Sequence, residues 1–63
     1  MTYSAAQKIK ANETLGGFAA QGAVFTNEVF QGSQYIFRAT LPNGQCKFVI
    51  IAKGGRVVDH GWS

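Results

Sequence analysis

Short apolar runs alternate with glycine-bearing turns along the last two thirds of the chain. Four runs rich in Val, Ile, Phe and Tyr cover, in order, residues 23–31, 34–41, 45–53 and 56–62. The pairs between them are Gly32-Ser33, Asn43-Gly44 and Gly54-Gly55. Glycine-bearing pairs between apolar runs are strong hairpin signals, because two-residue turns need positive φ angles. The pattern predicts four antiparallel strands that follow one another as a meander.

The first part of the chain has a helical pattern instead. Residues from about 3 to 15 are good helix formers without Gly or Pro, and Thr2 or Ser4 can act as the N-cap. Gly16-Gly17 is expected to end the helix in a left-handed conformation, and whether Phe18–Gln21 adds another turn stays open. The apolar stripes are weak, so we expect this helix to depend on packing against the sheet. The fold class is therefore α+β, with one N-terminal helix on a four-stranded meander.

Two-residue turns also fix which side chains share a face of the sheet, because side chains alternate along a strand. Residue 31 then pairs with 34, 42 with 45, and 53 with 56. The face predicted to form the core beneath the helix carries Val24, Thr26, Glu28, Phe30, Tyr35, Phe37, Ala39, Leu41, Cys46, Phe48, Ile50, Ala52, Val57, Asp59 and Gly61. Cys46 faces Leu41 in this register and is interpreted as a small buried apolar residue.

The opposite face has no cover in so short a chain and is the predicted partner-binding surface. Its candidate residues are Phe25, Val29, Ile36, Arg38, Lys47, Val49, Ile51, Lys53, Arg56, Val58, His60 and Trp62. An exposed patch of apolar side chains often marks an interaction site. Trp62 faces Lys47 in this register, which allows a cation–π contact.

Composition narrows the class of protein. The 63 residues are 46% hydrophobic and 14% charged, which is not the composition of a disordered chain. The formal net charge is +3, and four of the six cations, but none of the three acids, fall on the predicted binding face. One cysteine excludes an internal disulfide, and we see neither a membrane span nor a signal pattern, so a cytoplasmic protein is expected.

Catalytic and metal-binding chemistry find no support in the sequence. The chain has one His and one Cys, and the predicted register sets His60 and Cys46 on opposite faces. Glu28 and Asp59 lie on opposite edge strands, too far apart to act as paired carboxylates. No residues have metal-ligand spacing. We therefore expect a protein that is not an enzyme and needs neither metal nor cofactor.

Three functions for the binding face remain open. Its aliphatic centre and charged rim resemble a protein interface, and in that case we expect the partner to be a larger protein or nucleoprotein complex with an acidic rim. Its cations and aromatic rings also suit nucleic acid, and two copies stacking these faces would make a structural homodimer. Small chains without a catalytic set are commonly inhibitors or adaptors, many of them accessory proteins of phages or other mobile elements.

Overall fold

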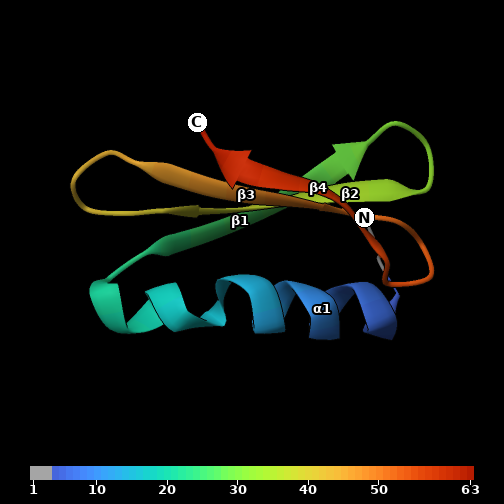
Figure 1. Cartoon of the computed structure of the whole chain (residues 1–63), viewed down its shortest axis with the longest axis horizontal. Helices are drawn as coiled ribbons and strands as arrows, with labels where there is room; N and C mark the ends of the chain where they lie inside the picture. Colours follow the sequence, from blue (N-terminus) through green and yellow to red (C-terminus); the bar gives the residue numbers. More distant parts are fainter. Residues whose placement is uncertain (1–3) are drawn as a thin grey trace.

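The computed structural model describes residues 4–63 and confirms the α+β architecture (Figure 1). One helical segment covers one face of an antiparallel sheet whose strand order is β1-β2-β3-β4. The elements are α1 (Ala5–Leu15), the 3-10 helix η1 (Gly16–Gln21), β1 (Val24–Phe30), β2 (Gln34–Thr40), β3 (Cys46–Ile51) and β4 (Val57–Trp62). α1 packs mainly on β3 and β2, which leaves β1 beside it.

The helix begins at a complete capping box. The Ser4 side chain accepts a hydrogen bond from the Gln7 N–H at 3.2 Å, and the Gln7 side chain accepts one from the Ser4 N–H at 2.9 Å. Ser4 is thus the N-cap, as one of the two predictions had it. The other, Thr2, and the predicted first residue 3 lie outside the described residues.

The α-helix ends at Leu15, as predicted, but the predicted left-handed conformation of Gly16-Gly17 is wrong. Gly16 is right-handed, with φ −59°, and its N–H bonds to the Asn12 carbonyl, so the backbone continues into η1. The left-handed glycine is Gly22, at φ 80°, and it ends η1 rather than α1. Phe18 packs against the core from η1, and this contact accounts for the additional turn.

All three hairpins have three-residue loops, not the predicted two-residue turns. Leu41 pairs with Gln45 around Pro42-Asn43-Gly44, and Gly44 has φ 89° and donates its N–H to the Leu41 carbonyl. This is a type I turn followed by a left-handed glycine, the usual three-residue hairpin. Loops 31–33 and 53–55 likewise hold three residues, because Phe30 pairs with Gln34 and Ala52 with Arg56.

The register differs by one residue at both ends of β2, so the side chains of this strand point to the face opposite to the one predicted. Asn27 lies opposite Phe37, and Phe37 opposite Val49, so these side chains share the helix-covered face. Between β3 and β4, a bulge at Val58 restores the predicted register: Ile51 pairs with Val57, but Ile50 with Asp59. The two predicted faces therefore exchange their β2 residues, and Val57, which lies before the bulge, also changes face.

The core lies between the helix and the middle strands. It contains Ala11, Leu15, Tyr35, Phe37, Ala39, Val49 and Ile51, with Phe18, Ala23 and Val57 packed against it. The helix thus covers the face of β3 that was expected to be bare. Gln7 also faces the sheet from α1 and is only 1% exposed. Its Nε2 donates to the Ser33 and Ile51 carbonyls, each at 3.2 Å, so one amide joins the helix to two neighbouring parts of the sheet.

No element among residues 4–63 covers the second face of the sheet (Figure 1), yet its centre is closed. Ile36 and Ile50 face each other there and are 6% and 7% exposed, so the side chains around them on the same face provide their burial. Cys46 lies on this face opposite Thr40, not Leu41, and is half-buried rather than buried. Within residues 4–63 no helix has the length and apolar character needed to cross a membrane.

Candidate interaction surface at the edge of the sheet

The residues predicted to bind a partner do not share one surface. Ile36 and Arg38 lie on the uncovered face, whereas those of β1, β3 and β4 with regular pairing lie on the helix side: Phe25, Val29, Lys47, Val49, Ile51, His60 and Trp62. Val49 and Ile51 are fully buried beneath the helix. The prediction of one continuous basic-apolar face is therefore wrong, because the β2 residues of that set lie on one face of the sheet and most of the others on the opposite face.

The cations are also dispersed. Lys10 pairs with Glu13 at 3.1 Å, and Arg38 pairs with Glu28 on the neighbouring strand. Lys53 and Arg56 flank the β3–β4 loop, at the end of the sheet where Ser4 donates a hydrogen bond to the Lys53 carbonyl. Neither face of the described sheet concentrates positive charge, contrary to the prediction.

The predicted pairing of Lys47 with Trp62 is confirmed. The Lys47 ammonium lies 5.4 Å from the centroid of the indole ring, and the two residues face each other across β3 and β4. Phe18 meets the same indole edge-to-face, with ring centroids 5.6 Å apart. Trp62 thus connects the last strand to η1 while remaining half exposed.

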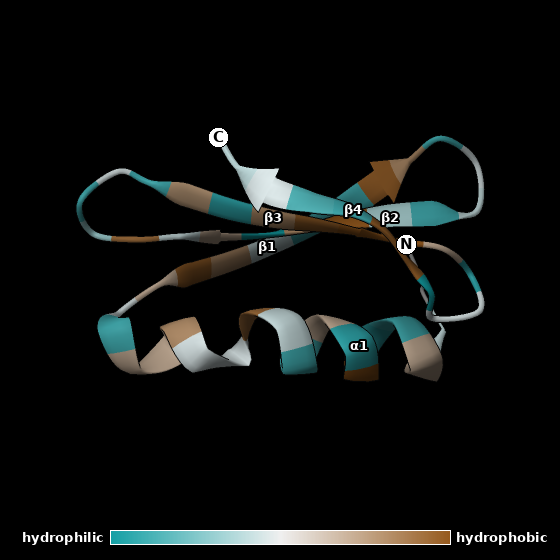
Figure 2. Ribbon diagram, in the orientation of Figure 1, coloured by the Kyte–Doolittle hydropathy of each residue, from teal (hydrophilic) through white to brown (hydrophobic). Residues whose placement is uncertain are grey.

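The exposed apolar side chains gather on the edge strands instead. Six large hydrophobic residues are exposed within residues 4–63, and all but Ile9 lie on β1 or β4: Val24, Phe25, Val29, Val58 and Trp62. The β1 members are 64%, 46% and 48% exposed in chain order. Figure 2 shows this hydrophobic character as brown residues at the start of β1. An apolar edge strand is a surface suited to another protein chain.

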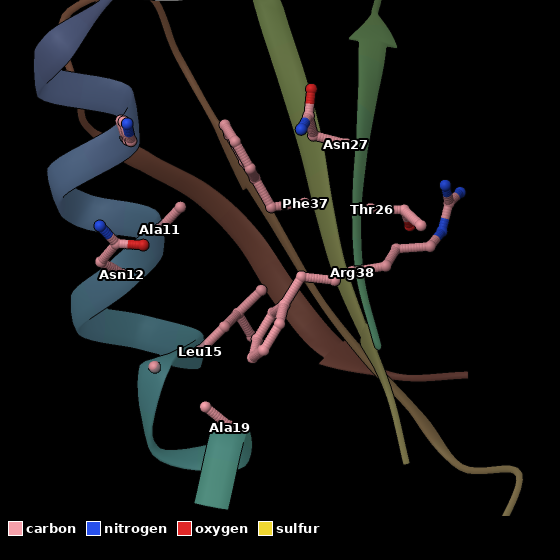
Figure 3. A pocket seen from close by; sticks show the side chains of 11 residues that line it. Ala11, Asn12, Leu15, Ala19, Thr26, Asn27, Phe37 and Arg38 are labelled. Carbon is pink, nitrogen blue, oxygen red and sulfur yellow. The ribbon is translucent and has the colours of Figure 1, made fainter. Parts of the chain in front are cut away.

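A groove of about 260 Å³ runs between the helix and β1 (Figure 3). Leu15 and Ala11 line it from α1, and Phe37 lines it from the sheet. Phe25 contributes an exposed ring from β1, because the helix lies over β2 and β3 and leaves this strand uncovered. The lining is thus largely apolar although the groove is open to solvent.

Polar side chains border the groove. Lys8 and Asn12 stand one turn apart on α1, and Asn27 lies across from them on β1. Within the described part of the chain, Lys8 forms no ion pair, so its charge is available to a ligand. An apolar floor with a positive charge at its border suits an apolar group that carries an acid beside it.

The one His and the one Cys of the sequence lie on different faces of the sheet. His60 lies on the helix side and Cys46 on the uncovered side, so the two cannot act together. Among residues 4–63 no three His, Cys, Asp or Glu side chains gather as metal ligands require.

Sequence reasoning did not find the groove, although one signal for it was present. Val24-Phe25 and Val29-Phe30 place apolar side chains on both faces of β1 at both ends of the strand. A strand with one solvated face shows simple alternation, so apolar pairs of this kind indicate contacts on both sides.

No protein-family model matches this chain, and neither curated proteins nor solved structures gave a significant match.

Proposed function

We propose that this chain is a non-enzymatic protein-binding protein that receives an apolar side chain of a larger partner in the groove between α1 and β1. The observation that carries the proposal is the apolar groove itself, bordered by Lys8 and by the exposed ring of Phe25. Its volume of about 260 Å³ is below the range of about 300–1,000 Å³ typical of small-molecule sites. One aromatic or aliphatic anchor of a protein fits it better.

The anchor is expected to stand next to an acidic residue of the partner. Lys8 has no ion-pair partner among residues 4–63, and a carboxylate placed beside it would gain a charge pair next to a largely desolvated contact. Anchors of this type commonly supply most of the binding free energy of an interface. A small protein that holds a side chain of a larger partner in this way acts as an inhibitor or an adaptor.

Blocking the groove tests the proposal. Asn12→Trp places a large ring at the groove from the helix, and Ile9→Trp places the same ring on the outer helix face, where Ile9 is 59% exposed. The immobilised protein captures partners from a lysate of its source, and binding of the purified partner is then titrated. We expect the Asn12→Trp variant to lose at least about tenfold in affinity, the energy of one good anchor, and Ile9→Trp to bind normally.

Salt dependence distinguishes the nucleic-acid alternative. Phosphate contacts make affinity fall steeply as salt rises, whereas an apolar anchor is affected little. A ligand removed by nuclease, with steep salt dependence and no response to Asn12→Trp, would show nucleic-acid binding through other residues and refute the groove proposal.

A further inference from the structure

The two edges of the sheet differ in how they are protected against other strands. Natural edge strands avoid uncontrolled pairing by means of bulges, glycine or proline, and charged side chains. β4 has a bulge at Val58, a glycine at Gly61, and the side chain of Asp59, which accepts a hydrogen bond from the His60 N–H at 2.9 Å. β4 is therefore a poor template for another strand.

β1 has none of these features. It pairs regularly with β2 over seven residues without a bulge and contains neither Gly nor Pro. Its one charge, on Glu28, is already paired with Arg38 of β2. Nearly the whole strand is exposed, and no other element within residues 4–63 pairs with its outer edge. The chain protects its β4 edge but leaves the apolar β1 edge open. This difference indicates that another strand pairs with β1.

The sequence of β1 is complementary to itself. Read from either end, Val-Phe-Thr-Asn-Glu-Val-Phe gives two apolar residues, three polar residues and two apolar residues. Antiparallel pairing of two copies about a two-fold axis at Asn27 sets these side chains opposite each other: Val24 and Phe30, Phe25 and Val29, Thr26 and Glu28. Apolar groups then meet apolar groups on both faces of the sheet, and the two central amides meet each other.

Neighbouring registers lack this match. Two-fold antiparallel pairing requires one residue to face its own copy, so the next alternatives are centred on Thr26 or on Glu28. Centring on Thr26 sets Val24 against Glu28. Centring on Glu28 sets the two carboxylates directly opposite each other, which is unfavourable. Only the register centred on Asn27 matches every side chain.

We propose that β1 pairs with β1 of a second copy of this chain, antiparallel and centred on Asn27, to form a two-fold dimer. The two sheets become one continuous sheet with both helices on the same side. This goes beyond the proposed groove function and does not depend on it. The contact lies at the strand edge, whereas the groove opens above the strand, so a dimer would present two grooves side by side.

The first test is the mass of the purified chain in solution. Sedimentation equilibrium over a wide range of concentration should fit a monomer–dimer equilibrium, with a dimer of twice 6.8 kDa. Hydrogen exchange supplies a local readout, because the outward amides of β1 gain protection only when a second strand pairs with them. We expect this protection to rise with protein concentration in β1 and not in β4.

Charge variants at Thr26 test the register. In the dimer Thr26 faces Glu28 of the second copy, so Thr26→Glu sets like charges opposite each other at two symmetric places. We expect it to weaken dimerisation about tenfold and Thr26→Lys to strengthen it. Within one chain Thr26 also faces Arg38 on β2, and this contact favours Glu over Lys at position 26. Thermal denaturation of each variant, measured on the monomer, separates a weaker dimer from a less stable fold.

Val58→Lys and Ile9→Lys are the matched controls. Each adds a charge at an exposed apolar position away from β1, and both should leave the dimer unchanged. The proposal is overturned if the chain stays monomeric at all concentrations, or if Val58→Lys rather than Thr26→Glu dissolves the dimer. Open-ended polymers, which a β1-to-β4 contact would give, also overturn it. Partner binding by a monomer would leave the groove function intact.

Discussion

Replacing the buried amide of Gln7 by a carboxyl group should make this protein depend on pH in a characteristic way. The Gln7 Nε2 donates to the Ser33 and Ile51 carbonyls, and its Oε1 accepts from the Ser4 N–H. Gln7→Glu keeps the shape and the acceptor but removes both donors. An ionised carboxylate would then face two carbonyl oxygens in a site that is 1% exposed.

The magnitude can be worked from the two hydrogen bonds that the substitution removes. Each hydrogen bond contributes about 1 kcal/mol, so their removal costs about 2 kcal/mol. Burying the unpaired charge adds several kcal/mol more. A chain of 63 residues has a total stability of about 3–9 kcal/mol at the usual value per residue. Gln7→Glu should therefore be mostly unfolded, or close to it, at neutral pH.

The sign of the pH dependence is opposite to that of a paired surface acid. Burial beside carbonyl oxygens raises the pKa of the introduced carboxyl group in the folded state above its unfolded value of about 4.3. Below that unfolded value the protonated group donates to one carbonyl, and the variant keeps the most stability. Stability is then lost as the pH rises toward the folded-state pKa.

Urea denaturation followed by circular dichroism at about pH 4 and about pH 7 measures this effect against the wild type. Gln7→Met is the control, because it has a similar volume, removes three hydrogen bonds at a cost of about 3 kcal/mol, and introduces no charge. If the free energy of unfolding changes equally for the Glu and Met variants between the two pH values, Gln7 is not buried against the two carbonyl groups as described.

Three further substitutions test the backbone geometry by chemical and thermal denaturation. Ser4→Ala removes the capping box and the bond to the β3–β4 loop, so it should cost about 1–2 kcal/mol. Gly55→Ala should cost about 2 kcal/mol, because φ is +94° and the new methyl group would lie 2.9 Å from one on α1, whereas Gly54→Ala meets open space and should be nearly neutral. Gly16→Ala should stabilise the fold by up to about 1 kcal/mol, because Gly16 is right-handed and alanine is the better helix former. Gly22→Ala should destabilise it by about as much, because Gly22 is left-handed. If both substitutions changed the stability equally and with the same sign, the assigned backbone conformations would be wrong.

The elements of this fold could be predicted from the sequence, but their relative phase could not be read from glycine pairs alone. Turn residues locate a loop, whereas the loop length decides which side chains face the core. Leu41-Pro42-Asn43-Gly44 contained the missing information, because Pro at the second position and Gly at the fourth are typical of a type I turn with a left-handed residue after it. A two-residue turn inferred from Asn43-Gly44 alone shifts the predicted pairing of β2 with β3 by one residue.

The candidate site was harder to predict because it depends on where the helix lies over the sheet. Nothing in the β1 sequence specifies that α1 sits over β2 and β3 and leaves Phe25 beside a groove. The burial of Gln7 had a clearer sign, since Ser4 followed three residues later by Gln is a capping-box pattern. Its hydrogen bonds to the sheet still required the three-dimensional structure.

The position of Trp62 gives the protein a built-in optical reporter. It is the only tryptophan of the chain, and its ring touches Phe18 of η1 on one side and the Lys47 ammonium on another. Indole emission therefore responds when the helical segment separates from the sheet, even while the strands stay paired. Compared with circular dichroism on the same sample, it distinguishes undocking of the helix from loss of the whole fold.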